Sequence, residues 1–137
     1  MKPYSLLSHT ADIGIQVKGR TLKELFKNSA FALFDIIADL PRVRIKERIN
    51  VNLTSGNLEE LLHDWLKELL FECNAHSFVC KRFSISKLND TSITSTALGE
   101  RITNNDILKT EIKAITYHNL FIKKEKSGWK TSLILDV

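Results

Sequence analysis

The chain has 137 residues, of which 43% are hydrophobic and 26% are charged, as is usual for one globular domain, here residues 1–137. No apolar run approaches the roughly 20 residues that a transmembrane helix needs, and the N-terminus lacks the apolar core of a secretory signal. We therefore expect a cytoplasmic protein without membrane contact. Two cysteines, Cys73 and Cys80, are too few for a disulfide framework, and we expect two buried thiols rather than a bridge.

The net charge of +4 is distributed unevenly along the sequence. Segment 57–76 holds five acidic residues and one lysine, a net charge of −4, so the rest of the chain carries +8. The basic part favours an acidic partner such as RNA, whereas the acidic segment suits a basic protein surface.

Hydrophobic periodicity predicts alternating strands and helices in the first part of the chain. In chain order these are a strand at 4–7, a polar turn at 8–12, a strand at 13–18, a helix from 21 to 39, and a strand at 42–53. Thr21 and Glu24 form a capping box at the start of the helix. Pro41 prevents the helix from continuing.

One face of the predicted strand at 42–53 carries a row of cations, namely Arg42, Arg44, Lys46 and Arg48. Such a row is able to bind phosphates. It is equally a solvated face that prevents edge-to-edge pairing, and the sequence leaves both interpretations open.

In the second part of the chain, the hydrophobic pattern predicts one helix followed by consecutive strands. Asn57 and Glu60 form a cap signature, and the following apolar stripe requires a helix with one buried face. Strands follow at 78–88, 92–98, 111–124 and 129–137, and the last two read as an antiparallel hairpin. This order predicts an α+β fold in which two helices pack on one face of a mostly antiparallel sheet.

A second flank of the helix after Asn57 presents acids at intervals of four residues: Glu60, Asp64, Glu68 and Glu72. Like charges at this spacing repel one another on an isolated helix. The flank is either a solvated face or a docking surface for a basic partner.

Two aspartates near the chain ends are candidate metal ligands. Asp12 precedes a strand, where aspartate often bonds only its own backbone. Asp136 interrupts an apolar strand, and Val137 adds a terminal carboxylate beside it. Oxygen ligands of this kind suit a hard cation, but nothing in these residues alone brings the two ends together. The sequence has no glycine-rich phosphate loop or nucleophile elbow, which argues against an independent enzyme.

Three motifs resemble those of the archease family: His-Thr-Ala-Asp at 9–12, Glu-Ile-Lys-Ala-Ile-Thr-Tyr-His at 111–118 and Leu-Asp-Val at 135–137. The start of the first helix and Leu-Glu-Glu-Leu-Leu at 58–62 also match in order, so the resemblance spans essentially the whole chain. The ordered set, rather than any single motif, is specific. Residues 78–108 match only in general character.

Members of that family are α+β proteins that assist tRNA-splicing ligases of the RtcB type. Such a ligase must be guanylylated on a histidine before it joins RNA ends. The resemblance implies that this protein promotes guanylylation and multiple turnover, meeting GTP through the ligase and tRNA indirectly, without being catalytic alone. It also implies a divalent metal on Asp12, Asp136 and Val137, calcium first and magnesium or manganese as alternatives. The alternative function is an RNA-binding or chaperone-like partner of a tRNA cytosine methyltransferase.

Four further polar residues in these motifs are functional candidates: His9, Glu111, Lys113 and Tyr117. His9 either supports a metal from its second shell or caps the turn. The other three alternate onto one predicted strand face. If that face looks toward the metal, Lys113 approaches a nucleotide phosphate; otherwise the face is solvated. His63 lies outside the motifs and is expected to be structural.

Overall fold

A computed structural model describes residues 2–7 and 12–137 of the chain. The described part contains seven strands: β1 (Tyr4–Leu7), β2 (Asp12–Gly19), β3 (Glu47–Thr54), β4 (Phe78–Leu88), β5 (Ser92–Arg101), β6 (Ala114–Glu125) and β7 (Gly128–Asp136). Its two α-helices are α1 (Leu22–Ile37) and α2 (Leu58–His76), and two 3-10 turns are η1 (Leu40–Arg42) and η2 (Asn105–Ile107). Among these residues, neither helix has the length and apolar character needed to cross a bilayer.

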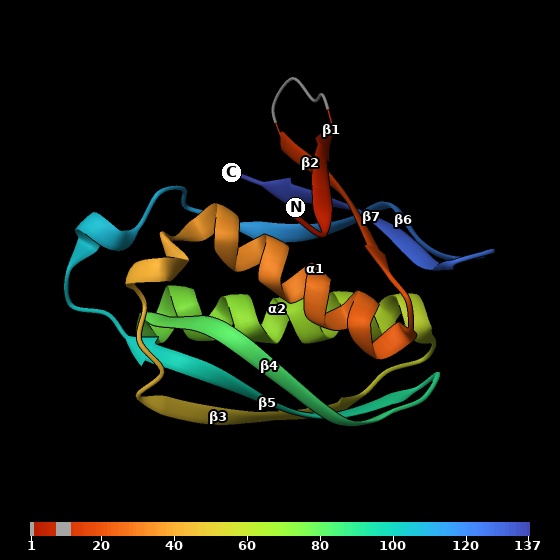
Figure 1. The fold of residues 1–137 in the computed structure, drawn as a ribbon, viewed down its shortest axis with the longest axis horizontal. Coiled ribbons are helices and arrows are strands. Elements are labelled where there is room, and N and C mark those ends of the chain that lie inside the picture. The colour runs from red at the N-terminus through yellow and green to blue at the C-terminus, as the bar shows by residue number, and fades with distance from the viewer. Residues whose placement is uncertain (1, 8–11) are drawn as a thin grey trace.

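The strands form two antiparallel sheets with the helices between them. The strand orders are β1-β2-β7-β6 and β3-β5-β4. Figure 1 shows α1 and α2 as a middle layer, and both helices contact strands of each sheet. The α+β class, with antiparallel strands and two helices packed on them, is confirmed. The prediction did not include the division into two sheets. β3, β4 and β5 form one sheet, and β1, β2, β6 and β7 form the other, which brings the two ends of the chain together.

Both predicted helix caps are confirmed. The Thr21 hydroxyl accepts the backbone N–H of Glu24 at 3.1 Å, and the Glu24 carboxylate accepts the backbone N–H of Arg20 at 3.0 Å. The Asn57 side chain accepts the backbone N–H of Glu60 at 2.9 Å. These bonds satisfy backbone donors that a helix start otherwise leaves without partners.

The strand predicted at 42–53 is shorter than its alternating pattern suggests. Pro41 lies within η1, and β3 begins only at Glu47. Proline fixes its own φ and lacks an N–H, which favours a tight turn over a paired strand. Ile45, within the predicted strand, is 40% exposed. Three of the four cations in the predicted row therefore precede the strand, and the row does not share one strand face.

The hydrophobic core lies between the two sheets and centres on Trp65 of α2, which is 0% exposed. Its indole ring packs against Phe26 of α1 and Phe83 of β4 at centroid distances of 5.9 and 6.0 Å. Its indole N–H donates to the Ser95 hydroxyl at 2.9 Å, so the buried polar group is satisfied.

Cys73 and Cys80 are both buried and unbridged, as predicted. Burial raises the pKa of the Cys73 thiol to about 11. The pKa of Cys80 is also raised, first by burial and then by Cys73 and Glu72 nearby. Both thiols therefore stay protonated near neutral pH and act as small apolar groups.

Candidate functional site

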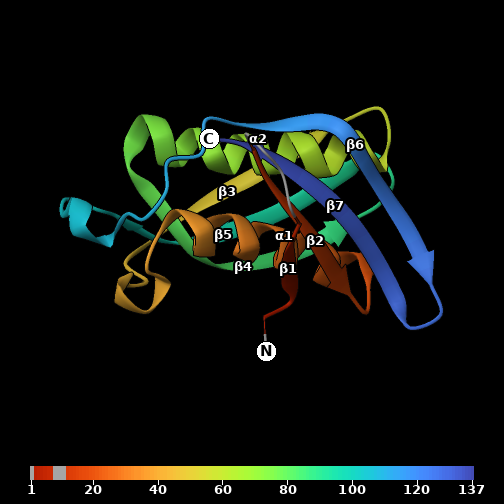
Figure 2. The same ribbon diagram turned by 90° about the horizontal axis from the view of Figure 1, so that it is seen from above.

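The two aspartates near the chain ends lie opposite each other on adjacent strands. β2 and β7 pair antiparallel, and Asp12 is the direct partner of Asp136. On the other side of β7, Ala114 of β6 pairs with Asp136. Figure 2 shows these strands side by side, with the C-terminus at one end of the sheet. The sheet therefore supplies the contact between chain ends that the sequence alone could not establish.

Both aspartate side chains lie on the face of the sheet that points away from the helices. Side chains alternate between the two faces of a strand, and Ile15 and Leu135 of the same strands are buried against the core. Asp12 and Asp136 have the opposite parity and are half-buried. Among residues 2–7 and 12–137, neither carboxylate has a hydrogen-bond or ion-pair partner.

This cross-strand pair is electrostatically unfavourable without a cation. Side chains directly opposite each other have Cβ atoms about 4.5–5.5 Å apart, and like charges at such positions destabilise the sheet. A divalent cation between the two carboxylates would convert this repulsion into attraction. Carboxylate oxygens are also the ligands that calcium and magnesium prefer, so the donor set fits the implied metal.

A third ligand would come from the end of the chain. Val137 directly follows Asp136, is 40% exposed and carries a second carboxylate. Within the part of the chain that the structure describes, no three side chains of His, Cys, Asp or Glu gather as a metal site. The terminal carboxylate of Val137 as third ligand stays a prediction. His9, expected either to support the metal or to cap the turn, lies outside the described residues.

Lys113 contacts Asp136 through its backbone, whereas Glu111 lines a different region, and the predicted alternation of these residues is not observed. The Lys113 backbone N–H donates to the carbonyl oxygen of Asp136 at 2.7 Å, which places Lys113 beside the pair. β6 begins only at Ala114, and both Ile112 and Ile115 are buried. The expected alternation is thus broken between these residues, and Glu111 instead lines a small cavity next to the C-terminal end of α2.

Tyr117 points toward α2 and belongs to a polar cluster that the sequence did not reveal. Its ring stacks on His63 at a centroid distance of 3.7 Å, and its hydroxyl donates to Asp64 at 3.2 Å. His63 Nδ1 lies 3.1 Å from the Asp64 carboxylate, and His63 Nε2 lies 2.8 Å from the carbonyl oxygen of Ile115. The Ser55 hydroxyl donates to the other Asp64 oxygen at 2.7 Å. His63 is 7% exposed, and its structural role stays a prediction.

The electrostatics of this cluster follow from its contacts. Burial alone would raise the pKa of Asp64, but the contacts from His63, Ser55 and Tyr117 outweigh it and hold that pKa below its usual range. Burial, followed by the neighbouring carboxylates of Asp64 and Glu60, raises the pKa of Tyr117 to about 12. The cluster therefore joins β6 to α2 through an ionised aspartate and a protonated phenol.

The acidic flank of α2 is only partly available to a partner. Glu60 accepts the backbone N–H of Gly56 at 2.9 Å, and Glu72 contacts His76 Nδ1 at 3.2 Å. Asp64 is committed to the cluster just described. Glu68 is exposed and has no polar partner among the described residues, so it is the acid of this flank best suited to docking.

Comparison with known proteins gives one consistent result. The model of the Archease protein family matches residues 4–137. A protein archease of Methanosarcina barkeri is 38% identical, with 99% of this chain and 97% of that protein covered. Protein 1598 of Methanobacterium thermoautotrophicum, solved in solution, has a TM-score of 0.87 and 34% identity over the full length of both chains.

A further likeness concerns the fold alone. The crystal structure of a Thermotoga maritima protein described as an archease and possible chaperone has a TM-score of 0.67. It is 20% identical to this chain, with 96% of this chain and 94% of that one covered. The arrangement of two helices between two sheets therefore persists in a protein of low sequence similarity.

Proposed function

Because this chain belongs to the archease family, we propose that it activates an RNA-splicing ligase of the RtcB type. The activation consists of faster guanylylation of the ligase and support of multiple turnover in tRNA splicing. The ligase performs the chemistry and binds GTP, and tRNA is met indirectly through it. We place this activity in the cytoplasm.

One structural observation connects the proposed activity with particular residues. The aspartates of the first and last family-like motifs, Asp12 and Asp136, are direct cross-strand partners on an outward face. Two directly opposite carboxylates without a counter-ion among the described residues repel each other, and a bound cation or a basic partner would relieve this repulsion.

We propose that Asp12, Asp136 and the terminal carboxylate of Val137 hold a divalent cation, with calcium as the first candidate. When bound, the cation would supply positive charge for the triphosphate of a nucleotide held by the ligase. The protein's own contribution is positional. The pairing of β2 with β7 fixes the two carboxylates, and the Lys113 N–H holds the carbonyl of Asp136.

An activator raises a rate only if it binds the transition state, or the conformation leading to it, better than the resting ligase. The outward face that carries the aspartates suits this role because both carboxylates are accessible from one side. Lys113, whose backbone N–H contacts the Asp136 carbonyl, is a candidate cation for a phosphate at this end of the sheet. Glu68 of α2 would act separately, by attracting a basic ligase surface during association.

The alternative is a chaperone-like partner of a tRNA cytosine methyltransferase. It is supported by the description of the Thermotoga maritima relative as a possible chaperone. The cross-strand aspartates have no evident use in that role. Stimulation of tRNA methylation, without any effect on a ligase, would favour it.

The test is a guanylylation assay with the cognate ligase, GTP and a divalent metal. Adding this protein should accelerate formation of the guanylylated ligase and increase the RNA joined per ligase molecule. Without ligase, the protein should neither join RNA nor consume GTP. Ligase-free joining would make it an enzyme, and an unchanged guanylylation rate would remove the proposed function.

A further inference from the structure

The β3-β5-β4 sheet has one face toward the helices and one face that no other element of the described chain covers (Figure 1). On the central strand β5, Ile93, Ser95 and Ala97 are buried on the helix side. The residues between them therefore point outward, and so do their direct partners on the neighbouring strands. These residues form what we call the outer face: Arg48, Asn50 and Asn52 of β3, Thr94, Thr96 and Leu98 of β5, and Arg82, Ser84 and Lys87 of β4.

Three cations occupy corners of the outer face. Arg48 and Arg82 lie on either side of Leu98, and Lys87 lies beside Thr94. All three cations are exposed, and none has an ion-pair partner among residues 2–7 and 12–137. Of the row of cations predicted from the sequence, only Arg48 belongs to a strand, and it belongs to this face.

No acid of the surrounding strands neutralises these cations. None of the nine residues of the outer face is acidic. The next outward residue of β5, Glu100, pairs with Lys46 at 4.0 Å. Asp90 lies in the turn between β4 and β5, near one edge of the face. Even with Asp90 counted against one cation, the outer face keeps a net positive charge.

The other positions of the outer face, apart from Leu98, are neutral hydrogen-bonding side chains. The side-chain oxygen of Asn50 accepts from the Thr96 hydroxyl at 3.1 Å, and that of Asn52 accepts the backbone N–H of Ser95 at 3.0 Å. Both amide NH₂ groups, and the hydroxyls of Ser84 and Thr94, have no partner within the described part of the chain.

Aromatic rings are absent from the outer face. Phe78 and Phe83 are the aromatic residues of these three strands, and both are buried. The face therefore offers cations and hydrogen-bonding groups but nothing on which an unstacked base would stack.

We propose that the outer face binds the backbone of double-stranded RNA. Adjacent strands are about 4.8 Å apart and residues about 3.3 Å apart, so Arg48 and Arg82 are separated by about 10 Å and Lys87 lies about 13 Å further along the sheet. Cations spaced in two directions suit phosphates on both strands of a duplex. The amides and hydroxyls between them suit the 2′-hydroxyls of its wide, shallow minor groove.

Other polyanions fit the outer face less well. Proteins that bind single strands without sequence preference generally use aromatic stacking, which this face lacks. An acidic protein would need an apolar interface core, and Leu98 alone does not supply one. The proposed contact goes beyond ligase activation and does not rest on it, because the paired aspartates belong to the other sheet.

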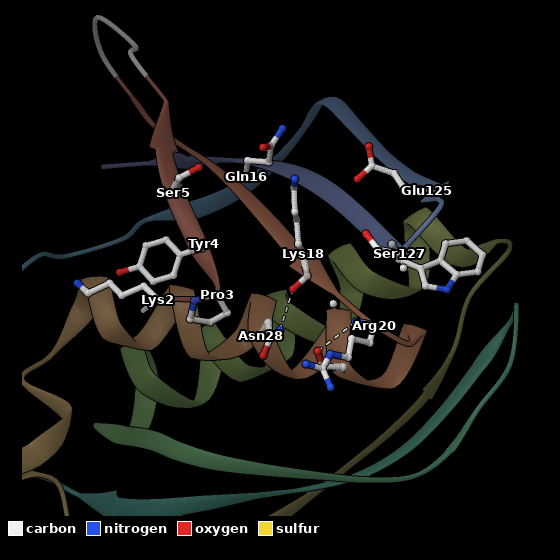
Figure 3. A pocket seen from close by; sticks show the side chains of 14 residues that line it. Lys2, Pro3, Tyr4, Ser5, Gln16, Lys18, Arg20, Asn28, Glu125 and Ser127 are labelled. Carbon is white, nitrogen blue, oxygen red and sulfur yellow. Dashed lines mark hydrogen bonds between the residues drawn. The ribbon is translucent and has the colours of Figure 1, made fainter.

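Another exposed basic pair provides a matched control. Figure 3 shows Lys18 and Arg20 at a pocket of about 710 Å³ that is also lined by Glu24 and Glu125. Acids therefore accompany the cations there, unlike on the outer face. Replacing Lys18 and Arg20 removes one lysine and one arginine, as does replacing Lys87 and Arg82.

The test uses the full chain without ligase and a fluorescent RNA duplex of about 16 base pairs, the span of a typical duplex-binding domain. Arg82→Gln with Lys87→Gln should raise the Kd about tenfold at moderate salt. Because each phosphate contact on a duplex contributes about 0.9 to the salt slope, that slope should fall by about 1.8. Arg48→Gln, on the opposite edge strand, should raise the Kd about threefold and lower the slope by about 0.9. The control Lys18→Gln with Arg20→Gln should bind nearly as the parent does.

Competing polyanions complete the test. The duplex should bind more tightly than single-stranded RNA of the same sequence, duplex DNA, polyglutamate or vesicles rich in phosphatidylserine. Equal weakening by the outer-face and control variants would overturn the proposal, since net charge alone would then explain binding. Binding of any of the four competitors as tight as that of the RNA duplex would overturn it as well.

Discussion

Asp64 accepts hydrogen bonds from side chains on different parts of the fold, namely Ser55 before α2 and Tyr117 of β6, and it contacts His63. Its position on the helix surface suggested a charge for docking, yet its carboxylate joins α2 to the last hairpin. Its pKa is held below the usual range by these contacts, against the opposing effect of burial. An aspartate of this kind stabilises the fold only while it is ionised.

Asp64→Asn should therefore change how stability depends on pH. The folded-state pKa is lower than the unfolded value of about 3.9, so the contribution is full above that value and is lost as pH falls through the folded pKa. Urea unfolding should show the variant less stable than the parent at pH 7, with a smaller difference near pH 3. Asp90→Asn, in the exposed turn between β4 and β5, should follow the parent at both. An equal difference at both pH values would contradict the assignment.

The cross-strand pair gives the second prediction at the residue scale. In the absence of divalent metal, Asp136→Asn should raise the free energy of unfolding by about 0.2–1 kcal/mol, because it removes repulsion from Asp12. With calcium added, the parent should gain thermal stability and the variant should gain little, since only a site with both carboxylates binds the ion well. Thermal melts with and without calcium measure both effects. A calcium-induced rise in the Tm of the variant equal to that of the parent would remove the metal site.

At the scale of elements, α2 has a capped start and an exposed acid, Glu68, that we propose for docking. Its first turn depends on Asn57, whose side chain accepts the N–H of Glu60. Asn57→Ala should lower the free energy of unfolding by about 1 kcal/mol, the usual cost of losing such a cap. Chemical denaturation measures this value, and Asn57→Ser should retain most of the stability because serine also caps. Equal losses in both variants would show that the cap contributes little.

Glu68 tests the docking role of the same helix without disturbing the cluster at Asp64. Glu68→Lys should slow association with the ligase and reduce its salt dependence, because charges at the rim of an interface act mainly on the association rate. Saturated guanylylation should stay nearly unchanged. Asp90→Lys, on the far sheet, is the matched control. A loss of stimulation at saturating concentration would mean that docking and activation are not separable.

The local sequence pattern predicts the starts of both helices correctly but places the start of β6 too early. Capping signatures located both helix starts, since a cap depends on residues only a few positions apart. The start of β6 was misplaced because Glu111, Lys113 and Tyr117 seemed to alternate, while the buried pair Ile112 and Ile115 breaks that register. Asn119, with a φ of +56°, marks a further irregularity in this strand. The carbonyl groups of Ile112 and Ile115 contact Asn74 and His63 of α2, and the local pattern does not record such tertiary contacts.

At the scale of the whole molecule, the sequence indicated the antiparallel final hairpin and the α+β class but not the two-sheet arrangement. The pairing of Asp12 with Asp136 is a contact between opposite chain ends, and no local periodicity predicts it. Both residues lie in motifs that resemble those of the family, and the β2–β7 register pairs them directly. The contact between β6 and α2 through Tyr117, His63 and Asp64 also depends on the folded chain.

We propose that the joined chain ends, through Asp12 and Asp136, accelerate guanylylation of the ligase. Single-turnover guanylylation, measured with the activator at saturating concentration and with a divalent metal present, tests it most directly. Asp136→Asn should bind the ligase as the parent does yet leave guanylylation near its unassisted rate, while Asp90→Asn should retain full stimulation. Stimulation by Asp136→Asn equal to that of the parent would contradict the claim.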